Sequence, residues 1–172
     1  VVFHVINTTG SPAITYAQLQ WQLACLNAAF SNSLNTFNAS PLGPQGKNTD
    51  IQFCFAKQVK TASSTYTAWP TPDFGVINYT TINSQIINID MLNAGSLTAL
   101  AGLTNFNTNF PRLEYLNIWV VPNICKSGSG CVLTAPPNVI GFAFPPWSTG
   151  GILDGIVMRK DCIGNSSFAT AF

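Results

Sequence analysis

Three segments of the C-terminal half decide the fold: RLEYLNIWVV at 112–121, NVIGFAF at 138–144 and GILDGIVMRK at 151–160. Each contains a short run of β-branched and aromatic residues bounded by Gly, Pro, Asn or Asp, which is typical of a β-strand. We expect strands at 115–121, 139–144 and 155–158. The first is apolar on both alternating faces, so it is predicted to lie inside a sheet.

The N-terminal part predicts a strand followed by a helix. Residues 1–6, VVFHVI, are apolar on both faces apart from His4, as expected for a central strand. Because His4 is the only histidine, we interpret it as a hydrogen-bonded structural residue and not as a metal ligand. Thr15 and Gln18 form a T-x-x-Q capping box, and apolar residues recur behind it at helical spacing. A helix is therefore predicted over 15–32, with its apolar stripe on the sheet.

The middle of the chain is less regular. Residues 51–57, IQFCFAK, alternate between apolar and other side chains and predict a strand with one apolar face. Residues 76–81 predict another strand. Residues 61–75 are polar and contain Pro, so we expect a long surface loop. Residues 84–110 are expected to be irregular, with short helical turns broken near Gly95.

Together these patterns predict an α+β fold. At 172 residues the chain is long enough to bury a core, and we expect a single domain over residues 1–172. Its predicted architecture is a twisted mixed β-sheet of about five strands with one long helix packed on it.

Composition and charge indicate an extracellular protein. Only 8% of residues are charged, with seven basic against six acidic, so nothing favours nucleic acid or an anionic membrane as a partner. No apolar run approaches the ~18 residues that a membrane helix needs. A chain so rich in Asn, Thr and Ser is typical of secretion. Its N-x-S/T triplets are glycosylation candidates, or chance products of that composition, at Asn7, Asn38, Asn78 and Asn165.

The five cysteines form no C-x-x-C pair, which argues against a zinc ribbon or a thioredoxin-type site. Cys125 and Cys131 enclose the flexible stretch KSGSG and are candidates for a disulfide in an oxidising compartment. The alternative is two reduced thiols. Because the count is odd, at least one of the cysteines is unpaired within the chain, and the pairing of Cys25, Cys54 and Cys162 stays open.

Several segments resemble one known family. YLNIWV, GFAFP and DGIV, together with VVFHVI, AITYAQLQWQLACLNAAF and IQFCFA upstream, resemble the strands and first helix of the pappalysin-type (M43-type) zinc metallopeptidases of the metzincin clan. Asn78 departs from that pattern, because a basic residue is common near this position. The resemblance implies a metzincin-like upper subdomain, the N-terminal part of a secreted catalytic domain.

The same resemblance implies a peptide-binding strand. Metzincins bind an extended peptide along an antiparallel edge strand above the active-site cleft, where backbone groups supply affinity. By resemblance, four residues occupy that strand here: Ile140, Gly141, Phe142 and Ala143. The alternative interpretation is an edge that Pro145 and Pro146 simply protect from pairing.

No catalytic or metal-ligating residue is predicted in this chain. The family's zinc helix, H-E-x-x-H-x-x-G-x-x-H, would follow the last strand, whereas the sequence stops at Phe172 before it. A catalytic zinc usually has three protein ligands, and one histidine without this motif cannot provide them. Asp154 is interpreted as a turn residue and Glu114 as no catalytic base. There is also no G-x-S-x-G elbow and no phosphate-binding glycine loop.

Two functions follow as hypotheses. In the first, the chain is the substrate-rim part of a secreted, zinc-dependent endopeptidase of pappalysin type. It is inactive alone, and zinc and peptide substrate are expected only with the missing C-terminal half. In the second, it is an extracellular structural or binding module that keeps a metzincin-like sheet without catalysis. Either way, an uncovered sheet predicts association with that missing half, with another polypeptide or with copies of itself.

Overall fold

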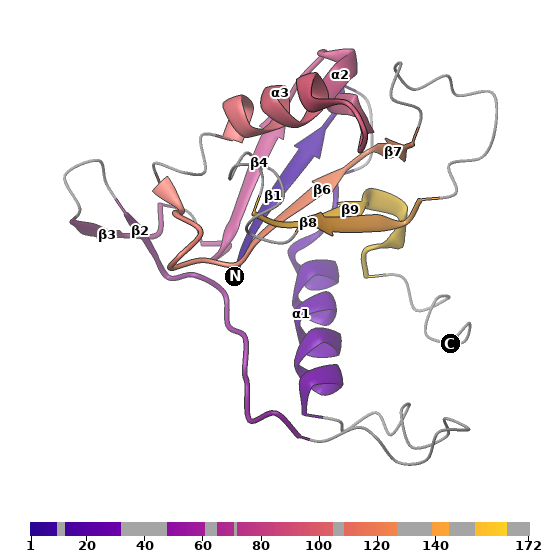
Figure 1. Ribbon diagram of the computed structural model, residues 1–172. Coiled ribbons are helices and arrows are strands. Elements are labelled where there is room, and N and C mark those ends of the chain that lie inside the picture. Colours follow the sequence, from indigo (N-terminus) through magenta and orange to yellow (C-terminus); the bar gives the residue numbers. More distant parts are fainter. Residues whose placement is uncertain are drawn as a thin grey trace, which may run out of the picture. The chain divides into compact units, whose positions relative to one another are not determined.

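A computed structural model describes residues 1–9, 13–31, 48–60, 65–70, 72–104, 109–126, 139–144 and 154–164 (Figure 1). The chain forms two compact units. The first comprises Val1–Ile14 and Phe55–Ile163, and the second comprises Thr15–Cys54 and Gly164–Phe172. The first unit contains the strands and the second contains the long helix.

The first unit is built on a five-stranded sheet in the order β4-β1-β6-β9-β8. Its strands are β1 (Val2–Asn7), β4 (Val76–Thr80), β6 (Asn117–Val121), β8 (Gly141–Phe144) and β9 (Gly155–Arg159). The first four in the order are parallel, and β8 runs antiparallel to β9. Figure 1 shows β1 and β6 in the interior of this sheet. The predicted mixed sheet and the interior positions of these two strands are confirmed.

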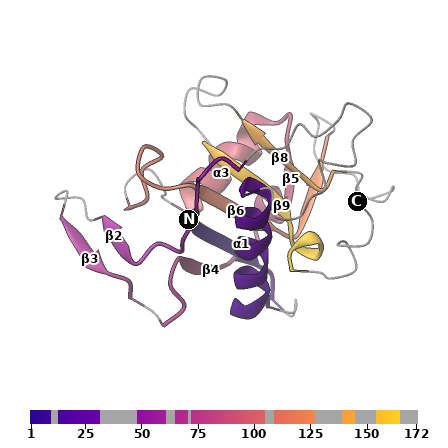
Figure 2. The ribbon, with the colours of Figure 1, turned by 90° about the horizontal axis from the view of Figure 1, so that it is seen from below.

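Two small sheets accompany the large one. β2 (Gln58–Lys60) pairs antiparallel with β3 (Tyr66–Ala68), and both ribbon views show this hairpin standing apart from the large sheet (Figures 1 and 2). β5 (Asn88–Asp90) pairs in parallel with β7 (Asn123–Cys125). The prediction of a plain loop over 61–75 is therefore wrong at β3, and β5 was not expected.

Residues 84–110 contain more helix than predicted. α2 spans Ser84–Ile87 and α3 spans Ala94–Thr104, so the helical stretch is interrupted at 88–93, just before Gly95, and α3 is longer than the short turns that we expected. Asn93 explains the difference. Its side-chain oxygen accepts a hydrogen bond from the Gly95 N–H (2.8 Å), and its carbonyl accepts one from the Leu97 N–H (3.3 Å). Gly95 thus lies in the first turn of a capped helix, where a glycine costs less than in a helix interior.

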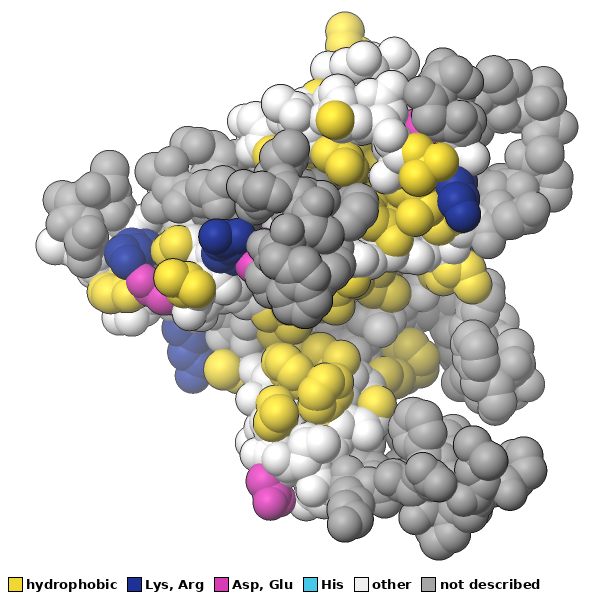
Figure 3. Space-filling model, viewed as in Figure 1, with side chains coloured by type: hydrophobic (Ala, Val, Ile, Leu, Met, Phe, Trp, Pro, Cys, Tyr) yellow, Lys and Arg dark blue, Asp and Glu magenta, His cyan; other side chains and the backbone are white. Residues whose placement is uncertain are grey.

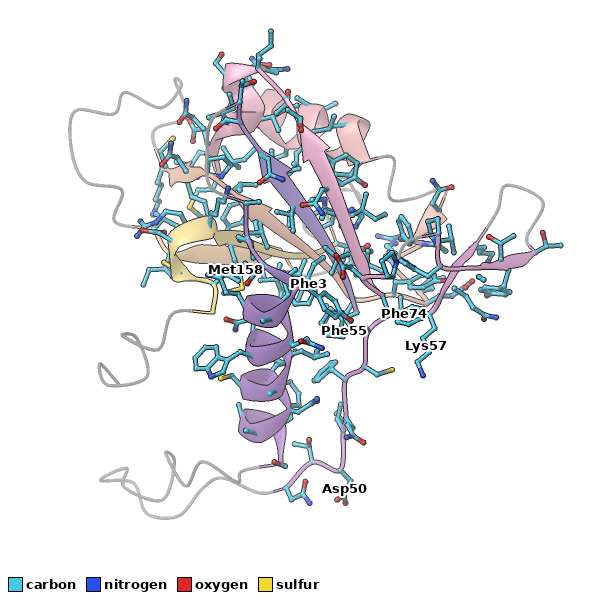
Figure 4. The ribbon with its side chains drawn as sticks, turned by 180° about the vertical axis from the view of Figure 1, so that it is seen from behind. Phe3, Asp50, Phe55, Lys57, Phe74 and Met158 are labelled. Atoms are coloured by element: carbon cyan, nitrogen blue, oxygen red, sulfur yellow. The ribbon has the colours of Figure 1, made fainter. Side chains whose placement is uncertain are left out.

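The apolar core of the first unit joins α2 and α3 to one face of the sheet. Its buried members are Ile6, Ile86, Ile89, Leu97, Leu100, Trp119, Val121, Ile124 and Val157. Phe3 and Val5 alternate with Ile6 along β1 and are also fully buried, so this central strand is apolar on both faces, as parallel strands usually are. Figure 4 shows Phe3 beside Phe55, with ring centroids 5.8 Å apart.

His4 is fully buried in β1 and has a partner on each ring nitrogen. Nε2 lies 2.9 Å from the Asn117 side-chain oxygen, and Nδ1 lies 3.1 Å from the Tyr79 hydroxyl. Because the Asn117 amide nitrogen donates to the Phe110 carbonyl (3.0 Å), its oxygen accepts from His4. The neutral ring therefore donates a hydrogen bond from Nε2 to Asn117 and accepts one at Nδ1 from the Tyr79 hydroxyl. The prediction of a structural, hydrogen-bonded histidine is confirmed.

The second unit contains helix α1, Tyr16–Phe30. Both bonds of the predicted capping box are present: the Gln18 N–H donates to Thr15 Oγ1 (3.3 Å), and the Thr15 N–H donates to Gln18 Oε1 (2.9 Å). The helix prediction is confirmed to Phe30, and its packing on the sheet stays a prediction. None of the helices among the described residues has the length and apolar character needed to cross a membrane.

The strand predicted over 51–57 is wrong, because these residues join no sheet and β2 begins only at Gln58. The backbone of Phe53 bonds instead to the side chain of Asn27. The Phe53 N–H donates to Asn27 Oδ1 (2.6 Å), and Asn27 Nδ2 donates to the Phe53 carbonyl (2.9 Å). The Phe53 ring packs edge-on against Phe30 at 4.8 Å between centroids. An amide side chain of α1 thus takes the place of a partner strand.

Candidate peptide-binding edge

β8 is one of the two outer strands of the large sheet, and among the described strands it pairs only with β9. Its register places Gly141 opposite Met158 and Ala143 opposite Ile156. The sequence placed this strand at 139–144 and at an edge. The edge position is confirmed, although the ladder begins at Gly141. The role of Ile140, Gly141, Phe142 and Ala143 in binding a peptide stays a prediction.

The backbone of β8 alternates between its partner strand and the open side. The Arg159 N–H donates to the Ile140 carbonyl (2.8 Å), which makes these opposed residues a hydrogen-bonded pair. In an antiparallel ladder such pairs alternate, so Phe142 also faces β9, whereas the N–H and C=O groups of Gly141 and Ala143 point away from it. No described residue bonds to these outward groups. They have the spacing that an added strand requires.

On one face of β8 a large side chain packs against the core. The other face carries only small residues. Phe142 packs against the apolar core around Trp119 and Val157. Ile140 is 43% exposed, and Gly141 and Ala143 are exposed as well. Because Gly141 and Ala143 are small and exposed, no large side chain at these two positions blocks a second polypeptide from the outward backbone groups.

Gly141 also lets β8 approach β9 closely. A Cβ atom at this position would lie 2.8 Å from the carbonyl oxygen of Val157, which is too short for a real contact. The glycine is therefore required by the pairing with β9 and not only by the open edge.

Arg159, at the end of β9, holds the residues just before β8 through its side chain. Its Nη1 donates to the Val139 carbonyl (3.3 Å), while Nε and Nη2 donate to the two carboxylate oxygens of Asp161 (2.5 and 3.0 Å). These bonds hold the pKa of the Asp161 carboxyl below its usual value. This contact was not predicted from the sequence. The R-x-D spacing at 159–161 was a local signal, but the neighbouring strand was not readable from it.

The other predicted site residues lie away from β8 or outside the described residues. Asn7 and Asn78 are neighbours, since Asn7 Nδ2 donates to Asn78 Oδ1 (3.2 Å), and Asn7 Oδ1 accepts from Lys160 (3.1 Å). Asn38 and Asn165 are outside the described residues, so glycosylation stays a prediction throughout. Cys125 ends β7. Its proposed partner Cys131 is not among the described residues, and the disulfide also stays a prediction.

The acidic residues that might suggest catalysis have structural partners. Glu114 bonds to Lys60 and to the Tyr66 hydroxyl, which ties the β2–β3 hairpin to the segment before β6, and the Lys60 hydrogen bond lowers the pKa of Glu114. Asp154 lies 4.0 Å from Arg112. Figure 3 shows basic and acidic side chains beside each other at the end where the hairpin lies, on a face with few other charges.

The described residues do not fit a zinc site. Nowhere in the described part of the chain do three or more His, Cys, Asp or Glu side chains gather in a way that could hold a metal ion. With one histidine in the whole sequence, three histidine ligands cannot come from this chain.

The sheet order, the antiparallel outer strand and the element sequence define a metzincin-like fold. A solved structure of a promirolysin mutant from Tannerella forsythia is similar to this chain, with a TM-score of 0.62 and 23% sequence identity. The match covers 96% of this chain and 47% of that one, so the chain spans about half the length of the solved protein. No protein-family model and no curated protein matches the sequence.

Proposed function

We propose that this chain is the substrate-rim part of a secreted, zinc-dependent endopeptidase of pappalysin type, and that β8 binds the peptide substrate. The observation that carries the proposal is the outward backbone of Gly141 and Ala143 on an edge strand. A guest strand running antiparallel to β8 would exchange two hydrogen bonds with each of these residues. The metzincin-like fold and the resemblance of the strand sequences support the same assignment.

The binding step can be tested directly on the 172-residue chain. The probe is a soluble ten-residue peptide of alternating Thr, Val and Lys, added to isotope-labelled protein while backbone amide resonances are followed. We expect the largest shifts at Gly141 and Ala143, because their N–H groups would gain an acceptor. The same peptide with N-methyl groups on alternate residues lacks the donors that pairing needs and should not bind.

A proline variant tests whether the peptide binds at the β8 edge or elsewhere on the surface. Ala143→Pro removes one outward N–H and leaves the bonds to β9 in place, so peptide affinity should fall about tenfold or more. Ala68→Pro in β3 is a matched control. The Trp69 N–H donates to the Lys57 carbonyl (3.0 Å), so Ala68, one residue away, also faces the open side of an exposed edge. Equal loss of binding in both variants, or binding of the methylated peptide, contradicts the proposal.

Catalysis is assigned to residues outside this chain. The isolated chain should cleave no peptide, because a hydrolytic zinc needs ligands that it lacks. Zinc quantification on the native protein and the coding sequence after Phe172 test this part. An H-E-x-x-H-x-x-G-x-x-H motif with stoichiometric zinc supports the peptidase. A stop codon or unrelated sequence favours the alternative, an extracellular binding or assembly module built on the same sheet.

A further inference from the structure

The chain immediately after β9 turns in the short 3-10 helix η1 (Lys160–Cys162). This turn brings the side chain of Asp161 next to that of Arg159, two residues earlier in the chain. Arg159 Nε and Nη2 each donate to a different carboxylate oxygen of Asp161. A two-point contact of this kind fixes the plane of a guanidinium group as well as its position.

The guanidinium held in this way reaches the neighbouring strand. Its remaining arm, Nη1, donates to the Val139 carbonyl (3.3 Å), and the backbone N–H of Arg159 donates to the Ile140 carbonyl (2.8 Å). Two successive carbonyls just before β8 therefore accept from one residue of β9. The Arg159 side chain is only 12% exposed, so water competes weakly for these bonds.

β8 needs such a support more than the interior strands do. β1, β6 and β9 each have a strand on both sides, whereas β8 pairs on one side only among the described strands. The ladder is four residues long. A small displacement at its start would rotate the outward N–H and C=O groups of Gly141 and Ala143 away from a guest strand.

We propose that Arg159 is the positioning residue of the β8 edge, with Asp161 as the group that orients it. By holding the carbonyls of Val139 and Ile140, Arg159 fixes the register of β8 and the direction of the outward groups at Gly141 and Ala143. The inference rests on the proposed function only where it concerns peptide affinity. The ordering of β8 by Arg159 stands independently of it.

Lys160 provides a matched control in the same turn. Its ammonium group donates to Asn7 Oδ1 (3.1 Å) at the end of β1, so this bond ties the turn to the middle of the sheet. Lys160→Met and Arg159→Met both replace a long cation by a long apolar side chain one residue apart. They differ in the strand that loses a hydrogen bond.

The experiment measures amide hydrogen exchange of the whole chain, residue by residue, together with the thermal midpoint. Arg159→Met should accelerate exchange at Phe142, whose N–H faces β9, by about tenfold, because the local opening of β8 loses a charge-assisted bond. Exchange in β1 and β6 should not change. Lys160→Met should leave Phe142 unaltered, and Asp161→Asn should reproduce part of the Arg159→Met effect by removing the carboxylate.

Peptide affinity supplies the second arm. With the Thr, Val and Lys peptide, Arg159→Met should weaken binding about tenfold while Lys160→Met retains it. Unchanged Phe142 exchange in Arg159→Met, or equal exchange effects of the two Met variants, overturns the positioning role. Arg159→Lys has one donor group and cannot engage Asp161 and Val139 in the same way, so it should not rescue. If the wild type does not bind the peptide, the proposed function is wrong. The hydrogen exchange of Phe142 then still tests the role of Arg159.

Discussion

His4 is a buried titratable group whose charged form has no counter-ion among the residues that the structure describes. Burial lowers the pKa of His4 from 6.5 to about 4, although the hydrogen bond with Asn117 acts in the opposite direction. The titratable group that faces the ring is Tyr79, whose own pKa burial raises to about 12, so it stays neutral. The ring also stacks on Trp119, with centroids 5.4 Å apart. Its surroundings therefore favour the neutral imidazole.

This burial makes the fold sensitive to acid. The folded pKa lies below the unfolded value, so the unfolded chain binds a proton first. The stabilising contribution is complete above pH 6.5 and is lost as the pH falls from 6.5 towards 4. The shift corresponds to roughly 3 kcal/mol. Urea unfolding at several pH values should show this slope, and His4→Gln should flatten it. Parallel pH curves for the two proteins would contradict the assignment.

Gly155, the first residue of β9, has a position that no other residue fits. Its φ is +154°, and a Cβ there would lie 2.2 Å from the Asn117 carbonyl oxygen. Gly155→Ala should destabilise the fold by roughly 2–4 kcal/mol or prevent folding. Gly102→Ala in α3 is the control, because nothing lies within 4 Å of the added methyl group, and it should stabilise by about 0.5–1 kcal/mol. Chemical denaturation measures both, and equal effects would refute the steric argument.

At the scale of elements, the contact between α1 and the segment at Phe53 shows how a strand-like sequence is held without a sheet. Asn27 supplies both the donor and the acceptor that a neighbouring strand would have supplied. Alternating apolar residues at 51–57 predicted the extended backbone, but the partner lies 26 residues away in a helix. The period of the apolar residues predicts which face of a segment is buried. It does not predict which group forms hydrogen bonds with the segment's backbone.

Asn27 should therefore matter more than its partly exposed position indicates. Asn27→Ala leaves the Phe53 N–H and C=O without their partner and should cost roughly 2 kcal/mol. Asn27→Asp keeps the acceptor and removes the donor, so its cost should be intermediate. The free energy of unfolding measures both variants. An alanine variant as stable as the wild type would show that water replaces the side chain fully.

The elements that sequence predicted well are those fixed by local pattern. β1, β4, β6, β9 and α1 each carry their own hydrophobic period or cap, and each appears within a few residues of its predicted bounds. β3 and β5 are three residues long and depend on partners elsewhere in the chain. The strand at 139–144 was also predicted from its own pattern, whereas its peptide-binding role came from resemblance. The Arg159 contact could not be predicted, because it requires knowing that β9 and β8 are neighbours.

For the whole molecule, an open edge predicts association. We expect the purified chain to bind another polypeptide or copies of itself, because the outward groups at Gly141 and Ala143 and the exposed Ile140 side chain offer both hydrogen bonds and apolar surface. Light scattering across a concentration series tests this. Ala143→Pro should reduce the association and Ala68→Pro should not. A monodisperse monomer at every concentration would count against the expectation.

The opposite direction of β8 has a consequence for the polarity of whatever it binds. Four strands of the sheet run one way and β8 runs the other. A polypeptide laid antiparallel along β8 would again run in the direction of β1 and β9, so the sheet would accept a chain in one N-to-C sense. A peptide and its retro-sequence have the same composition, charge and hydrophobicity, yet they would present their side chains in reverse order. A difference in affinity between the two peptides would show in which N-to-C direction a chain binds along β8.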